Sequence, residues 1–111
     1  MVVTHFADAE LVYAVRVKQV LAEDGPHFAP YDENSWLVRT ARLEEELRDT
    51  LARWRILREH TVRVLGSLEE AEWHRSGIHA TRGEITMRQL VGLMAEHDRT
   101  HLDQLRRALA G

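Results

Sequence analysis

His97 and His101 lie four positions apart and are the residues of this sequence whose type and spacing are best suited to metal chemistry. On an α-helix this spacing puts both imidazoles on one face, about 6 Å apart along the axis. From there both rings can reach one ion at about 2.0 to 2.1 Å. The chain contains seven histidines in 111 residues, which would give roughly 0.4 such pairs by chance, so the spacing alone is weak evidence.

The apolar residues around this pair strengthen the metal hypothesis. Leu90, Met94, His97, His101 and Leu105 follow one another at steps of four, three, four and four, so both histidines lie within an apolar stripe. Two adjacent imidazoles that face a core without partners are costly, because their ring nitrogens must be satisfied. A shared metal ion would satisfy both rings. The alternative is a pair of core histidines that are hydrogen-bonded to other side chains.

Three long helices must position these side chains, according to the spacing of the apolar residues. The first is predicted over residues 2–24 and ends at Gly25-Pro26. The second is predicted over residues 40–65, where apolar residues recur every three or four positions. The third opens at the capping box Thr86-Met-Arg-Gln89 and runs to about Ala108. The stripe of the second helix contains Leu43, Leu47, Leu51, Trp54, Leu57, Thr61 and Val64.

Two substantial connections join these helices. Residues 25–39 are predicted to form an ordered loop over one end of the bundle, because this segment is rich in aromatic side chains. After the second helix, Ser67 and Glu70 have the spacing of a capping box, which predicts a short helical turn. Ile78 and Ile85 then flank a segment that we expect to form a hairpin-like loop.

The composition narrows the class of protein. A hydrophobic fraction of 44% is enough for the core of one domain, which we assign to residues 1–111. Fifteen basic against eighteen acidic residues give a net charge of −3, which provides no general attraction for nucleic acid. No apolar run reaches the roughly 20 residues of a membrane span and no signal peptide is evident, so we expect a cytoplasmic protein. The chain has no cysteine, so nitrogen or oxygen atoms must hold any metal.

Three stretches of the chain carry a family resemblance. They are His5-Phe-Ala-Asp8, the segment from Trp73 to Thr86, and His97-Asp-Arg-Thr-His101-Leu-Asp-Gln-Leu105. Together, and in this order, they resemble the DinB/YfiT-like superfamily, in particular its DinB-like domain proteins, over nearly the whole chain. The resemblance implies an all-α, up-down four-helix bundle that holds a divalent metal ion with three histidines. It assigns His5 to the HxxD motif of that family, and His97 and His101 to its HxxxH motif.

The same resemblance implies the chemistry. Zinc and nickel are the usual ions of the family, and some members are transferases or isomerases that use a low-molecular-weight thiol such as glutathione, mycothiol or bacillithiol. We therefore expect a metal-dependent enzyme that acts on a small-molecule substrate as a thiol transferase or a hydrolase. Asp8 and Asp98 lie close in sequence to the histidines and are candidates to orient an imidazole or to act as a base, the alternative being surface charge. The alternative function is a non-catalytic metal-binding stress or interaction protein whose bundle serves for dimerisation.

The sequence departs from the family pattern in one respect. Only three of the usual four long helices are evident, because the helix that precedes the HxxD helix in the family has no counterpart before His5. Either the chain is shortened at its start, which puts the authenticity of Met1 in question, or a second subunit covers the exposed face. Apolar residues of the first predicted helix spread over more than one face. We therefore predict a homodimer in which symmetry-related helices complete the packing.

Overall fold

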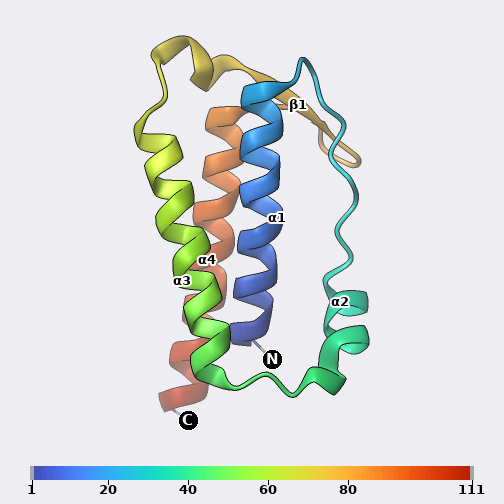
Figure 1. Cartoon of the computed structure of the whole chain (residues 1–111), viewed down its shortest axis with the longest axis vertical. Coiled ribbons are helices and arrows are strands. Elements are labelled where there is room, and N and C mark those ends of the chain that lie inside the picture. The colour runs from blue at the N-terminus through green and yellow to red at the C-terminus, as the bar shows by residue number, and fades with distance from the viewer. Residues whose placement is uncertain (1, 111) are drawn as a thin grey trace.

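The computed structural model of the chain describes residues 2–110, including their side chains apart from those of residues 2, 105, 108 and 109 (Figure 1). Three long helices run side by side along the long axis: α1 (Val2–Ala22), α3 (Leu47–Gly66) and α4 (Met87–Ala110). The α1 helix packs against both α3 and α4. The short helix α2 (Glu33–Thr40) lies against α1 and is the fourth helix of a mostly α-helical fold. This arrangement confirms the predicted fold class.

The segment between α1 and α3 differs from the prediction. The second long helix begins at Leu47 rather than near Thr40, because the chain leaves α2 through a 3-10 turn (Ala41–Leu43) and reverses at Glu44. Glu44 has a φ of 47°, in the left-handed region, which interrupts a helix. The predicted apolar stripe is consequently incomplete, since Leu43 and Leu47 are 71% and 53% exposed.

The main cluster of buried apolar residues lies toward the end of the bundle that carries a small hairpin. These residues come from α1, the segment after it, the hairpin and the first half of α4, so the core anchors the elements on both sides of the candidate site. Its members are Val17, Val20, Phe28, Ile85, Met87, Leu90 and Met94. Leu105 was predicted to continue this stripe, but its side chain lies outside the described part.

The connection from α3 to α4 contains a 3-10 helix (Glu70–His74) and two short strands, β1 (Ser76–His79) and β2 (Gly83–Thr86). The strands pair antiparallel, as expected of a hairpin-like loop. The capping box uses Glu69 and Glu72 rather than Ser67 and Glu70, because the Ser67 hydroxyl donates to the Val64 carbonyl at the end of α3. The predicted capping box at the start of α4 is present: Gln89 N–H donates to Thr86 Oγ1, and Thr86 N–H donates to Gln89 Oε1.

The hairpin is held against the segment that follows α1. Phe28 N–H donates to the Ile78 carbonyl at 2.9 Å, and Ile78 N–H donates to the Pro26 carbonyl at 2.7 Å. Gly77 is required here, because a Cβ at this position would lie 2.5 Å from Cζ of Phe28. From this contact the chain runs beside α1 to α2 at the other end of the molecule (Figure 1).

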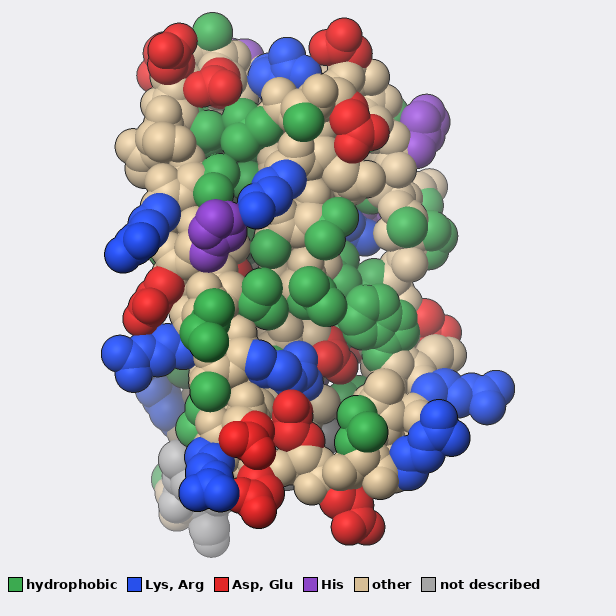
Figure 2. Space-filling view, in the orientation of Figure 1, with side chains coloured by type: hydrophobic (Ala, Val, Ile, Leu, Met, Phe, Trp, Pro, Cys, Tyr) green, Lys and Arg blue, Asp and Glu red, His purple; other side chains and the backbone are tan. Residues whose placement is uncertain are grey.

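Some large apolar side chains of the long helices remain exposed. Figure 2 shows hydrophobic side chains gathered over α1 and α3 in the middle of one face. The most exposed ones on these helices are Leu11, Val15, Leu47, Leu51, Ile56 and Val62. Within the described residues, no helix has both the length and the apolar character that a membrane span requires.

Candidate metal centre

The rings of His5, His97 and His101 lie together between α1 and α4. Each can offer one ring nitrogen to a common centre, and these three atoms all lie within 4.8 Å of one another. The ring centroids are 4.4 to 4.8 Å apart. The α4 helix contributes two rings because a spacing of four residues places them on one face, and α1 contributes His5 from its beginning.

The tautomer of His101 can be read from its partner. Its Nδ1 lies 2.7 Å from Oε1 of Gln104, which is a carbonyl oxygen and can only accept. His101 Nδ1 therefore donates, and the lone pair is left on Nε2. Gln104 thus fixes the ring in the state in which Nε2 can bind a cation.

His5 is the most enclosed of the three rings, at 5% exposure. Burial lowers its pKa, and the neighbouring His101 and His97 act in the same direction, while Glu33 and Asp8 oppose them. The ring is therefore held in its neutral form, which is the form that binds a metal. Its Nε2 lies 2.8 Å from Nε2 of His97, and its buried Nδ1 has no hydrogen-bond partner among the described residues.

These donors fit a divalent transition-metal ion. Bonds of about 2.0 to 2.1 Å in a tetrahedral shell place ligand nitrogens about 3.3 Å apart. The separation of 2.8 Å between the Nε2 atoms of His5 and His97 and the 4.8 Å limit on all three atoms bracket that spacing. Three neutral imidazoles without a thiolate form a nitrogen donor set that suits zinc, copper, iron or nickel.

Glu33 is a functional candidate that sequence reasoning did not identify. Its Oε2 lies 3.1 Å from Nε2 of His5. Glu33 is the first residue of α2, and its place is fixed by Asp32, whose carboxylate accepts hydrogen bonds from Ser35 N–H and Oγ. The signal available in the sequence was Asp32 followed three residues later by Ser35, which is suited to a helix start, but nothing in it linked Glu33 to the histidines.

The two candidate aspartates are both paired with arginines of α3. Asp8 Oδ1 accepts from Nη1 of Arg53 at 3.0 Å, and Asp98 Oδ2 accepts from Nη2 of Arg58 at 2.5 Å. Asp98 Oδ1 also lies 4.0 Å from Nδ1 of His97, which is too far for a direct hydrogen bond. Burial would raise the pKa of Asp98, but His97 and Arg58 outweigh it and lower that pKa. Asp98 is therefore a stable anion beside one of the three rings.

The remaining histidines occupy different surroundings. His27, His60 and His74 are exposed, and none of them lines the hollows described next. His79, at the end of β1, is half-buried and lines both hollows together with His97.

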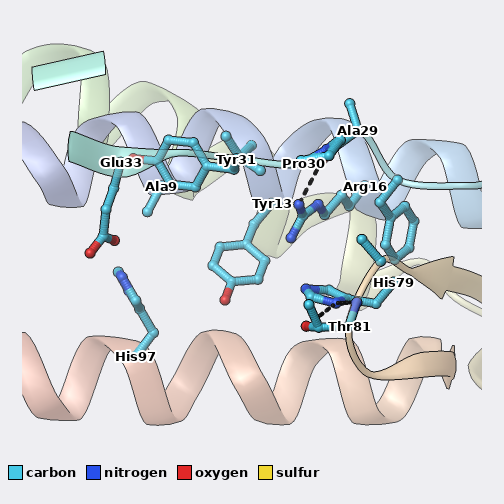
Figure 3. A pocket seen from close by; sticks show the side chains of 13 residues that line it. Ala9, Tyr13, Arg16, Ala29, Pro30, Tyr31, Glu33, His79, Thr81 and His97 are labelled. Carbon is cyan, nitrogen blue, oxygen red and sulfur yellow. Dashed lines mark hydrogen bonds between the residues drawn. The ribbon is translucent and has the colours of Figure 1, made fainter. Parts of the chain in front are cut away.

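Two of the three rings, those of His97 and His101, line neighbouring hollows of about 340 and 420 Å³. The first hollow is lined by His97 and Glu33, and the second by His97 and His101. The two hollows share Tyr13, Arg16, His79, Thr81 and His97. Figure 3 shows the carboxylate of Glu33 and the ring of His97 facing each other at one end of the first hollow. A small molecule in this space would therefore contact the rings of His97 and His101.

The family model of the DinB superfamily matches residues 2–105. This chain belongs to the DinB superfamily. The four-helix arrangement agrees with a solved structure, that of YfiT from Bacillus subtilis, which is described as a probable metal-dependent hydrolase with an unusual four-helix bundle topology. That structure aligns with a TM-score of 0.83 at 27% identity, over 98% of this chain and 65% of the YfiT chain.

Curated relatives carry related names. A protein of Geobacillus kaustophilus, named "Putative metal-dependent hydrolase", is 30% identical over 105 residues, which are 94% of this chain and 59% of the relative. A protein of the same description from Bacillus mycoides is 30% identical over 101 residues, covering 90% of this chain and 57% of the relative. The chain thus spans less than two thirds of the length of these relatives.

Proposed function

We propose that this DinB protein is a divalent-metal-dependent enzyme that hydrolyses a small-molecule substrate, with His5, His97 and His101 as the metal ligands. The observation that carries the proposal is the convergence of three ring nitrogens within 4.8 Å beside a hollow of about 340 Å³. The names of the curated relatives and of the matched structure support hydrolysis as the reaction class.

The number of ligands favours a catalytic over a structural site. Structural zinc is normally closed by four protein ligands, whereas catalytic zinc keeps three and an open position. The ring nitrogens of a three-histidine set suit zinc or nickel among the common divalent ions, and these are the ions that we propose. When bound, such an ion supplies Lewis acidity, which polarises a carbonyl group and makes water a better nucleophile at neutral pH.

Glu33 is the proton acceptor in this proposal. Its carboxylate lies 3.1 Å from Nε2 of His5, and its side chain is 56% exposed, so water can reach it. Asp98 has a different role in this proposal. It is an anion 4.0 Å from Nδ1 of His97, and its charge favours the tautomer that carries the proton on Nδ1, which leaves Nε2 for the ion.

Thiol transfer is the second candidate reaction. The observation that favours it is the presence of two hollows that meet at His97, because a transferase must hold a low-molecular-weight thiol and an electrophile at the same time. A non-catalytic metal-binding protein is the alternative if Glu33 acts as a fourth ligand, since the coordination shell would then be closed.

The experiment begins with elemental analysis of the purified protein. It continues with hydrolysis assays on carboxylic esters and amides, and with a thiol-conjugation assay using glutathione and bacillithiol. His97→Ala is the test variant, and His74→Ala, at an exposed histidine outside the hollows, is the matched control. Stoichiometric metal and a hydrolytic activity that only His97→Ala abolishes support the proposal. Bound metal with conjugation alone supports thiol transfer, and bound metal with neither activity supports the non-catalytic alternative.

A further inference from the structure

Arg16 is a buried arginine that the chemistry above does not use. It lies on α1, is 9% exposed, and stacks over the ring of Phe28 with its guanidinium carbon 5.3 Å from the ring centroid. Its Nη2 donates to the Ala29 carbonyl at 3.0 Å. Arg16 lines both hollows, so part of its guanidinium remains available to a molecule inside them.

No carboxylate neutralises Arg16 within the described residues. The buried acids of the same helix are engaged elsewhere, since Asp8 pairs with Arg53 and Glu10 pairs with Arg58. Burial lowers the pKa of Arg16, because the charged form loses hydration. A charge in this position is costly unless something compensates it, and the open side of the guanidinium faces the hollows.

His79 presents a second donor to the same space. Its Nδ1 accepts hydrogen bonds from the backbone N–H groups of Thr81 at 3.1 Å and Arg82 at 3.2 Å. Because Nδ1 accepts, the proton of the neutral ring lies on Nε2, which is therefore a donor. Burial lowers the pKa of His79, and the charges of Arg16 and Arg82 lower it further. Both arginines therefore contribute positive potential at the ring.

The first hollow is therefore polarised along its length. Figure 3 shows Arg16, His79 and Thr81 at one end, His97 and Glu33 at the other, and the hydroxyl of Tyr13 between them. The acidic groups that line the hollows lie elsewhere: Glu33 is at the histidine end, and Glu96 is an exposed residue of the second hollow.

We propose that Arg16, together with His79 and Arg82, forms a subsite for the carboxylate group of a small-molecule ligand. A guanidinium is suited to a carboxylate because its planar set of N–H groups matches the two oxygens. The ligand would compensate the buried charge of Arg16 and extend from there toward the three histidines. That this ligand is the substrate rests on the proposed function, whereas the binding itself does not depend on catalysis.

Calorimetric titration of the 111-residue chain, as purified with its metal, tests this subsite. The probes are butyrate and its neutral isostere butyramide, which differ in the charge of one end group. We expect butyrate to bind and butyramide to bind at least about tenfold more weakly, as is typical when a charge-assisted hydrogen bond is replaced by a neutral one.

Variants locate the bound carboxylate. Arg16→Gln and Arg82→Gln should each weaken butyrate binding, with the larger loss, at least about tenfold, for Arg16→Gln. Arg88→Gln removes the same charge from an exposed arginine that lines neither hollow and should leave binding unchanged. Arg82 is exposed, so its variant keeps the test valid if Arg16→Gln fails to fold.

The outcomes separate the subsite from the metal chemistry. If butyrate binds the wild type, Arg16→Gln and Arg82→Gln equally, it is held by the metal or elsewhere. This result overturns the subsite. Absence of butyrate binding to the wild type overturns it as well. Loss of binding in Arg16→Gln and Arg82→Gln supports the subsite even if no hydrolytic activity is found. In that case only the proposed function fails.

Discussion

Oε2 of Glu33 lies 3.1 Å from Nε2 of His5, so a carboxylate from α2 faces the ring nitrogen that α1 turns toward the other two histidines. The two residues belong to different helices, and the segment between them runs nearly the length of the molecule (Figure 1). The position of α2 therefore decides whether the site has a nearby base. Replacement of Glu33 therefore best distinguishes an enzyme from a non-catalytic metal-binding protein.

Glu33→Gln removes the proposed base but keeps the size and polarity of the side chain. If Glu33 accepts a proton during hydrolysis, kcat should fall by about 100-fold or more, while the metal content measured by elemental analysis stays unchanged. Glu84→Gln, at an exposed residue of β2, is the control and should behave as the wild type. A variant that loses its metal instead would identify Glu33 as a fourth ligand.

Metal removal should lower the thermal stability of the protein. An ion that binds only the folded state at about 1,000 times its Kd adds about 4 kcal/mol, so we expect EDTA to lower the Tm by roughly 10 to 20 °C. In His97→Ala the chelator should have no effect, whereas His74→Ala should respond like the wild type. An unchanged melting curve after EDTA treatment, with metal loss shown by elemental analysis, would contradict this prediction.

The pH dependence of stability should report the lowered pKa of His79. In the unfolded chain the pKa of the ring is about 6.5. As the pH falls, the ring therefore takes up its proton at a higher pH in the unfolded chain than in the folded one. Protonation then favours unfolding, so the free energy of unfolding should decrease as the pH falls from 6.5 to the folded pKa. Urea unfolding between pH 7.5 and 5 should show a larger decrease for the wild type than for His79→Asn. Parallel curves for the two proteins would show that the ring has the same pKa in both states.

Arg58 joins three helices through two carboxylates. Its Nη2 donates to Oε1 of Glu10 on α1 and to Oδ2 of Asp98 on α4. Glu10 is only 2% exposed, so Arg58→Gln leaves a buried charge without its partner and should cost about 2 to 4 kcal/mol. Arg55→Gln breaks an exposed pair with Glu59 and should cost less than about 0.5 kcal/mol. Denaturant unfolding measures both values, and equal losses in the two variants would show that the three-helix bridge adds no stability.

The homodimer stays a prediction. A cleft of about 270 Å³ with an almost entirely apolar lining lies between α1, α3 and α4, where Phe6 and Trp54 meet the exposed side chains of Leu51 and Leu102. Light scattering should give about twice the chain mass of 12.9 kDa. Leu51→Glu should shift the protein toward the monomer, whereas Val38→Glu, at a 74% exposed position of α2, should not. A folded wild-type monomer at micromolar concentration would contradict the dimer.

Local sequence signals predicted the parts of the fold that short-range interactions determine. The box of Thr86 and Gln89 gave the start of α4, and the spacing of His97 and His101 placed both rings on one face. Contacts that depend on tertiary packing could not be predicted in this way. Neither the left-handed turn at Glu44 nor the approach of Glu33 to His5 follows from a local pattern. His5 was identified only through the family resemblance, because nothing near it in the sequence marks it as part of a site.

The separation of His5 and His97 by 92 positions also fixes when the site can come into existence during synthesis. A ribosome that adds about 5 to 20 residues per second takes roughly 5 to 18 s to make the stretch between His5 and His97. During that interval the nascent chain carries one of the three rings, which offers a cation no chelate at this site. The site can therefore take up a metal ion only after α4 has been made, and the delay of metal uptake after synthesis of α4 would measure how quickly this helix packs against α1.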